Sequence, residues 1–145
     1  MAERIRIDKV EPAGYKAIIG LEKFIESTSL TKVHKDLIKI RASQINGCAF
    51  CIDMHTKDAR KTGETEQRIY GLNAWRDTPF YTDDERAILA ITEEITLISE
   101  THVSDETYDR ALSLLGEGYL AQVILSVITI NAWNRIGITT KLIPA

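Results

Sequence analysis

Two cysteines and a histidine stand close together in the chain, as Cys48, Cys51 and His55. If this segment is helical, separations of three and four residues place the side chains on one face, with neighbouring Cβ atoms about 5 to 6 Å apart. The two sulfur atoms could then bond to each other. The sequence has only these two cysteines, and their spacing favours redox or metal chemistry over a scaffold disulfide.

The position of His55 predicts which sulfur reacts first. Helical side chains lean toward the amino terminus, so we expect the imidazole to lie over the turn that holds Cys51. Attack on a peroxide needs a thiolate, and a thiol with a pKa of about 8.5 is mostly protonated at neutral pH. Unpaired amides at the helix start also favour the thiolate. We hypothesise that Cys51 attacks the oxidant, giving a sulfenic acid, and that Cys48 then closes a disulfide.

The elements that position this segment are predicted to be helices. Apolar residues recur at helical spacing along the chain, while the alternation typical of strands is missing beyond residues 4–10. Capping residues and glycines mark the helix ends. The predicted helices cover residues 12–26, 31–45, 48–62, 65–74, 82–99, 104–115 and 119–135, with Gly137 ending the last. The fold class is therefore all-α, a bundle of about six to seven helices.

Length and composition narrow the possible functions. A chain of 145 residues fits one domain, which we expect to span residues 1–145. Eighteen Lys and Arg against 21 Asp and Glu give a net charge of -3, and without a basic block we expect no nucleic-acid partner. The most apolar stretch, residues 120–130, is shorter than the ~20 residues that cross a bilayer. We expect no membrane partner and a cytoplasmic location, since residues 1–9 lack a secretory signal pattern.

Longer segments of the chain resemble a known family. The run LIKIRASQINGCAFCIDMHTKDAR, residues 37–60, together with GETEQRIYGLNAW and the late INAWNR, is similar to the alkylhydroperoxidase D-like (AhpD-like) branch of the carboxymuconolactone decarboxylase family. The resemblance covers most of the chain and implies an AhpD-like all-helical homo-oligomer, such as a dimer, trimer or hexamer. It also implies thiol-dependent antioxidant activity on a hydroperoxide, with a dithiol protein or small dithiol as reductant, no metal and no organic cofactor.

The resemblance implies a role for each site residue. The second cysteine, Cys51, reacts first, Cys48 resolves the product, and His55 accepts a proton in a relay with an acidic residue twelve positions before the first cysteine. Asp36 stands there, one methylene shorter than the usual glutamate, so it would need a bridging water to contact the cysteine pair. Asp36 could equally be a solvated side chain in the first turn of its helix. Some peroxidase members have a histidine where this chain has Phe50.

Other interpretations remain open from the sequence. The cysteines could be small buried hydrophobes, or zinc ligands with His55 and the distant His34 and His102, which we expect to be solvated. The chain could act as a disulfide reductase, or as a lyase with the decarboxylase chemistry that names the wider family. It could also be a non-catalytic oligomer that senses redox state or has only a structural role.

Overall fold

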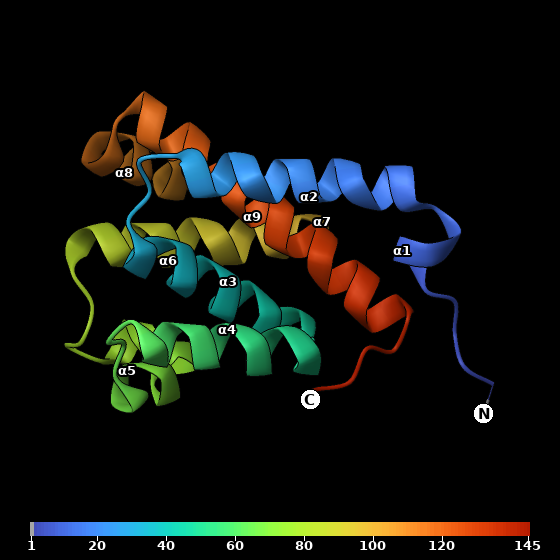
Figure 1. Cartoon of the computed structure of the whole chain (residues 1–145). Helices are drawn as coiled ribbons and strands as arrows, with labels where there is room; N and C mark the ends of the chain where they lie inside the picture. The colour runs from blue at the N-terminus through green and yellow to red at the C-terminus, as the bar shows by residue number, and fades with distance from the viewer. Residues whose placement is uncertain (1) are drawn as a thin grey trace.

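The computed structural model describes residues 2–145, and this part of the chain is helical and contains no strand (Figure 1). This confirms the all-α prediction. The helices are α1 (Ile7–Val10), α2 (Pro12–Ser27), α3 (Lys32–Asn46), α4 (Ala49–Lys61), α5 (Glu66–Tyr70), the 3₁₀ helix η1 (Leu72–Asp77), α6 (Asp83–Thr96), α7 (Ile98–Thr101), α8 (Asp105–Leu115) and α9 (Glu117–Thr139).

Short breaks make more helical elements than the predicted seven. The helix expected over residues 65–74 is divided at Gly71 into α5 and η1. The helix expected over residues 82–99 ends at Thr96, and α7 follows Leu97. Helical periodicity continues across such breaks, so it does not reveal them. The predicted capping box is confirmed, because Thr82 and Glu85 each accept a hydrogen bond from the other's backbone N–H.

The end of α9 corrects the prediction that Gly137 stops the last helix. Gly137 lies inside α9, which continues to Thr139. The chain leaves the helix at Lys141, whose φ of 56° is left-handed. The N–H of Lys141 donates to the carbonyl of Ile138, and the N–H of Leu142 donates to the carbonyl of Gly137. These two bonds form a Schellman-type cap without a glycine at the left-handed position.

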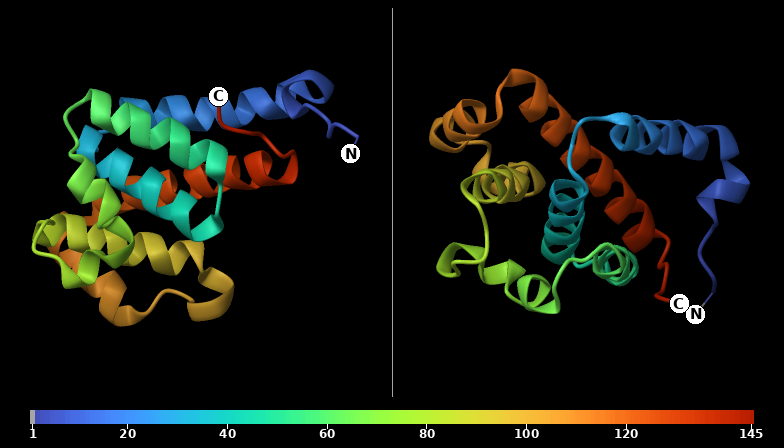
Figure 2. Two further views of the ribbon diagram at one scale, coloured as in Figure 1. Left: turned by 90° about the horizontal axis from the view of Figure 1, so that it is seen from below. Right: turned by 60° about the vertical axis from the view of Figure 1, so that its left-hand side comes forward.

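Helix α9 is the longest of the helices described, with 23 residues. It packs against α2, α3, α4, α6 and α8, and the views in Figures 1 and 2 show it running between α2 and the α3–α4 pair. One buried cluster joins α9 to α3 and α6 and includes Ile38, Ile88 and Val127. A second includes Leu37 and Leu72. Helix α3 contributes to both clusters, so it is held from two sides.

None of the helices among residues 2–145 is long and apolar enough to cross a membrane.

Candidate active site

The turn between α3 and α4 positions the cysteines. Gly47 adopts a φ of 71°, a left-handed conformation that glycine reaches without side-chain strain. The N–H of Cys48 donates to the carbonyl of Ser43 at 3.0 Å, which closes the cap of α3. Cys48 is then the N-cap of α4, so this helix begins at Ala49, one residue later than predicted. Cys48 thus closes the cap of α3 with its N–H and also serves as the N-cap of α4.

The structure joins Cys48 and Cys51 in a disulfide, with the two Cα atoms 5.3 Å apart. The Cys48 sulfur also accepts a hydrogen bond from the N–H of Cys51 at 3.4 Å. Both side chains are buried, with 1% and 2% of their surface exposed. The predicted bonding of the two sulfurs is therefore present, and the N-cap position directs one free amide of α4 at Cys48.

Helix α9 approaches the disulfide at Gly137. A Cβ atom added there would lie 3.2 Å from the Cys48 sulfur and 3.7 Å from the Cys51 sulfur. The first distance is shorter than an ordinary van der Waals contact, so the missing side chain lets the α9 backbone lie against the pair. An open, largely apolar groove of about 320 Å³ adjoins this contact and is formed by the turn at 47–49, the end of α9 and residues 141–143.

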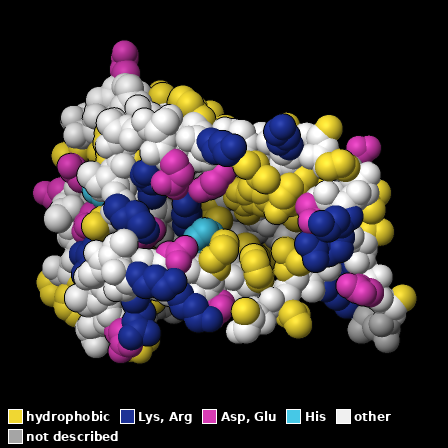
Figure 3. All heavy atoms as spheres, in the orientation of Figure 1, with side chains coloured by type: hydrophobic (Ala, Val, Ile, Leu, Met, Phe, Trp, Pro, Cys, Tyr) yellow, Lys and Arg dark blue, Asp and Glu magenta, His cyan; other side chains and the backbone are white. Residues whose placement is uncertain are grey.

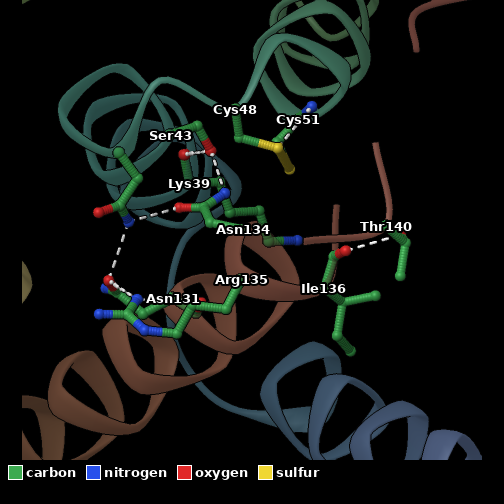
Figure 4. The surroundings of a disulfide bond; sticks show 10 residues. Lys39, Ser43, Cys48, Cys51, Asn131, Asn134, Arg135, Ile136 and Thr140 are labelled. Atoms are coloured by element: carbon green, nitrogen blue, oxygen red, sulfur yellow. Dashed lines mark hydrogen bonds between the residues drawn. A yellow bond between two sulfur atoms is a disulfide. The ribbon is translucent and has the colours of Figure 1, made fainter. Parts of the chain in front are cut away.

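A cluster of amides fixes α9 against the turn (Figure 4). The side-chain amide of Asn46, the residue before Gly47, donates to the side-chain oxygens of Asn131 at 3.0 Å and Asn134 at 2.9 Å. Asn134 is fully buried and donates in turn to the Ser43 hydroxyl at 3.0 Å. Figure 4 shows this cluster beside the disulfide, with Asn134 directed from α9 toward Ser43 on α3. The two asparagines of INAWNR, Asn131 and Asn134, are therefore structural groups.

His55 lies on α4 one turn after Cys51 and is partly buried. Burial, helped by the positive charge of Lys39, lowers the pKa of the imidazole to about 4. The ring is therefore neutral at pH 7 and can accept a proton. In the part of the chain described, it makes no hydrogen bond to either sulfur of the oxidised pair. Its action on Cys51 remains a prediction.

Lys39 on α3 is the strongest charge near this histidine. Its ammonium pairs with Glu22 of α2 at 2.9 Å and with Glu26 at 3.4 Å. Burial acts to lower the pKa of Lys39, but the two carboxylates outweigh it and raise that pKa. Lys39 therefore stays protonated, and its charge opposes a second positive charge on His55.

Asp36 is buried on α3, with 4% of its surface exposed, so it is not the solvated side chain that the sequence also allowed. Its carboxylate accepts a hydrogen bond from Lys32 at 2.5 Å. Burial raises the pKa of Asp36 and outweighs the opposing effect of Lys32.

Helix geometry places Asp36 away from the sulfurs. It precedes the end of α3 by ten residues, about 15 Å along the axis, whereas Cys51 lies about 3 Å into the adjacent α4. Because α3 and α4 pack as neighbours after a tight turn, Asp36 lies nearer the level of His55 than that of Cys51. A relay from Asp36 to the sulfur would therefore pass through His55 or water.

The other histidines lie apart from this site. His34 is half-buried, not solvated as expected, and its Nδ1 lies 2.6 Å from the hydroxyl of Tyr119. His102 is exposed after α7. Among residues 2–145, no three His, Cys, Asp or Glu side chains are placed to hold a metal ion together.

Sequence reasoning did not identify Gly137 or Lys39 as parts of the site. A glycine inside a continuous helical pattern often marks a place of close packing, and this was the available signal for Gly137. Nothing in the local pattern around Lys39 distinguishes it from a solvated lysine, because its two carboxylate partners come from α2.

Comparisons with known proteins give a family match and a relative of nearly the same length. Residues 12–94 match the carboxymuconolactone decarboxylase family. YdfG of Bacillus subtilis, an uncharacterized protein, is 47% identical over 138 residues, which cover 95% of this chain and 94% of YdfG.

Solved structures share the fold. A crystal structure from Agrobacterium tumefaciens, of a protein of unknown function described as a candidate antioxidant defence protein AhpD, superposes with a TM-score of 0.95 at 36% identity, covering 99% of both chains. The alkylhydroperoxidase AhpD core of an uncharacterized peroxidase-related protein from Ralstonia eutropha gives a TM-score of 0.79 at 16% identity, covering 93% of this chain and 72% of its own. The second likeness concerns the fold alone.

Proposed function

The chain belongs to the carboxymuconolactone decarboxylase family, with an AhpD-like fold, and from this premise we propose that it is a thiol peroxidase. Its substrate would be a hydroperoxide, and its redox group the Cys48–Cys51 pair. The observation that carries the proposal is the disulfide at the start of α4, next to a groove open to the outside. A pair that joins without unwinding the helix can alternate between dithiol and disulfide.

The proposed cycle has three balanced steps. The Cys51 thiolate attacks the terminal peroxide oxygen, the O–O bond breaks, and Cys51 becomes a sulfenic acid. The alkoxide leaves as an alcohol after it takes up the proton that His55 removed from the Cys51 thiol. The thiol of Cys48 then attacks the sulfur of Cys51, so that the disulfide forms and water leaves. A dithiol reductant finally returns two electrons and two protons to the pair and becomes a disulfide itself.

Neutral His55 supports the first step. Because its pKa lies near 4 beside the disulfide, the ring has a free lone pair at physiological pH. A nearby thiolate would attract positive charge and so raise the pKa of His55 in the reduced protein. Proton transfer from Cys51 to His55 is therefore easier in the reduced state than the value near 4 suggests. Asp36, whose pKa is raised by burial, would exchange that proton further along α3.

Intact mass after one equivalent of an organic hydroperoxide tests the proposal. We expect the reduced protein to lose two hydrogens. Cys48→Ser should instead hold a trappable sulfenic acid at Cys51, and Asp36→Asn should slow peroxide consumption while a strong oxidant still forms the disulfide. A sulfenic acid on Cys48 in Cys51→Ser, with none on Cys51 in Cys48→Ser, would reverse the assignment of the cysteines. Unchanged mass of the wild-type protein would contradict peroxidase activity.

A further inference from the structure

The two cysteines of the disulfide differ in their position relative to the groove. Cys48 forms part of the wall of the apolar groove, together with Gly47, Ala49, Gly137 and Ile138, whereas Cys51 does not line it. Cys51 lies in the first turn of α4, on the same helix face as His55, which follows one turn later. A molecule in the groove therefore meets Cys48 before Cys51.

Gly137 keeps this approach open in two ways. It has no Cβ, and an added Cβ would lie 3.2 Å from the Cys48 sulfur, so any larger residue would crowd that sulfur. Its carbonyl accepts the N–H of Leu142 at 2.9 Å, which holds the segment after α9 as the far wall of the groove. The groove and the contact with the sulfur thus depend on the same residue.

We propose that the reducing dithiol enters this groove and attacks Cys48, not Cys51, and that Gly137 is the positioning residue that permits it. The inference rests on the proposed function, because it concerns the step that reopens the disulfide. One thiolate of the reductant bonds to the Cys48 sulfur, the Cys48–Cys51 bond breaks, and Cys51 leaves as a thiolate that takes up a proton. The second thiol then attacks the reductant's own sulfur, forming the oxidised dithiol and releasing Cys48 as a thiolate that is also protonated.

Helix α4 favours both departures. Cys51 lies in its first turn, where the helix dipole stabilises negative charge. Cys48 already accepts the N–H of Cys51, so the thiolate released in the second exchange keeps a hydrogen-bond donor. A better-stabilised thiolate is a faster leaving group in thiol–disulfide exchange.

The lining of the groove indicates the class of reductant. Ile138, Leu142 and Ile143 line the groove with Cys48, and Lys141 is the one charged residue of its lining, so most of the lining suits a dithiol on an aliphatic chain. A dithiol with polar groups beside its sulfurs would have to lose their hydration without compensation. We therefore expect butanedithiol to reduce the protein faster than dithiothreitol does, after each rate is divided by that reagent's rate with a small reference disulfide.

The attacked sulfur can be identified directly in the wild-type protein. The disulfide is first formed with diamide, which makes this experiment independent of peroxide chemistry. A brief reaction with mercaptoethanol is followed by an acid quench and alkylation of the free thiol. One cysteine then carries a mixed disulfide with mercaptoethanol, and the other is alkylated. Fragmentation of the peptide containing residues 42–57 tells them apart. We expect the adduct on Cys48, and an adduct mainly on Cys51 would overturn the proposal.

Gly137→Ala tests the positioning role, with Gly118→Ala as the matched control in the same helix, since an added Cβ there meets nothing within 4 Å. We expect Gly137→Ala to slow reduction by butanedithiol at least about fivefold, the effect of modest overpacking, and Gly118→Ala to leave the rate unchanged. Equal rates in folded Gly137→Ala and Gly118→Ala would contradict the role of Gly137. If Gly137→Ala does not fold, the adduct on the wild-type protein still decides which sulfur is attacked.

The two proposals fail separately. Attack on Cys48 in a protein that does not consume peroxide would overturn the peroxidase function and leave the route of reduction standing. Peroxide consumption with reduction through Cys51 would do the reverse.

Discussion

At the scale of single residues, His55 is the group whose chemistry depends most on its surroundings. Two features of the fold keep its ring neutral: partial burial on α4 and the charge of Lys39, which α2 holds in place through Glu22. A free histidine has a pKa of about 6.5, so it would be partly protonated near neutral pH. The site therefore has a ring that is ready to accept a proton.

The same shift makes the stability of the oxidised protein depend on pH. Because the pKa of His55 is near 4 in the folded state and about 6.5 in the unfolded state, the unfolded chain binds more protons between these values. Stability should therefore fall with decreasing pH in this window, by about 2 kcal/mol between pH 7 and pH 5 from this residue. Urea unfolding of wild type and His55→Gln at both pH values measures it. Parallel losses in the two proteins would contradict the prediction.

At the scale of elements, the site is a contact between the α3–α4 turn and α9. The part-buried amide of Asn46 and the buried amide of Asn134 join the two. The Ser43 hydroxyl that accepts from Asn134 donates to the carbonyl of Lys39 at 2.6 Å. This chain of bonds starts one residue before Gly47 and ends on the lysine beside His55. It therefore links the second half of α3 to α9 beside the disulfide.

Asn134→Ala is expected to destabilise the protein by about 1 to 3 kcal/mol, because it leaves the buried Ser43 hydroxyl and the part-buried Asn46 amide each short of a partner. Denaturant midpoints measure the loss. Asn73→Ala, at an exposed position of η1, is the control and should change stability by less than about 0.5 kcal/mol. Equal midpoints for Asn134→Ala and Asn73→Ala would show that the amide cluster contributes nothing to stability.

At the scale of the whole molecule, the surface contains apolar areas that a single chain leaves uncovered. The face in Figure 3 is hollowed near its centre, and hydrophobic side chains gather there between charges of both signs. Phe24 on α2, Met54 on α4 and Ile138 on α9 are each at least 40% exposed. Both α2 and α4 pack against α9. Extended apolar patches typically mark interaction surfaces.

Self-association remains a prediction from the family resemblance, and these patches favour it. We expect light scattering to give a mass of at least two chains at micromolar concentration, for the oxidised and the reduced protein alike. The apolar surfaces do not depend on the disulfide, so reduction should leave the assembly intact. A mass of one chain under both conditions would contradict the prediction.

Local patterns of the sequence were enough for much of the fold. They predicted the all-α class, the helix over α2, the capping box of Thr82 and Glu85 and the exit of α3 at Gly47, because periodicity and capping act within one helix. They failed at Gly71 and Gly137. At both positions, contacts with other elements decide whether a glycine breaks a helix or lies inside it.

The sequence by itself determined the cysteine pair, since a spacing of three residues at a helix start brings Cys48 and Cys51 within bonding distance. Only the tertiary structure decided what surrounds that pair. Gly137 contacts the sulfurs from α9, which begins at Glu117, 68 residues after α4 begins at Ala49. Lys39 takes its partners from α2. Spacing encodes the face of one helix, whereas the opening to Cys48 and the neutral state of His55 come from how separate helices pack.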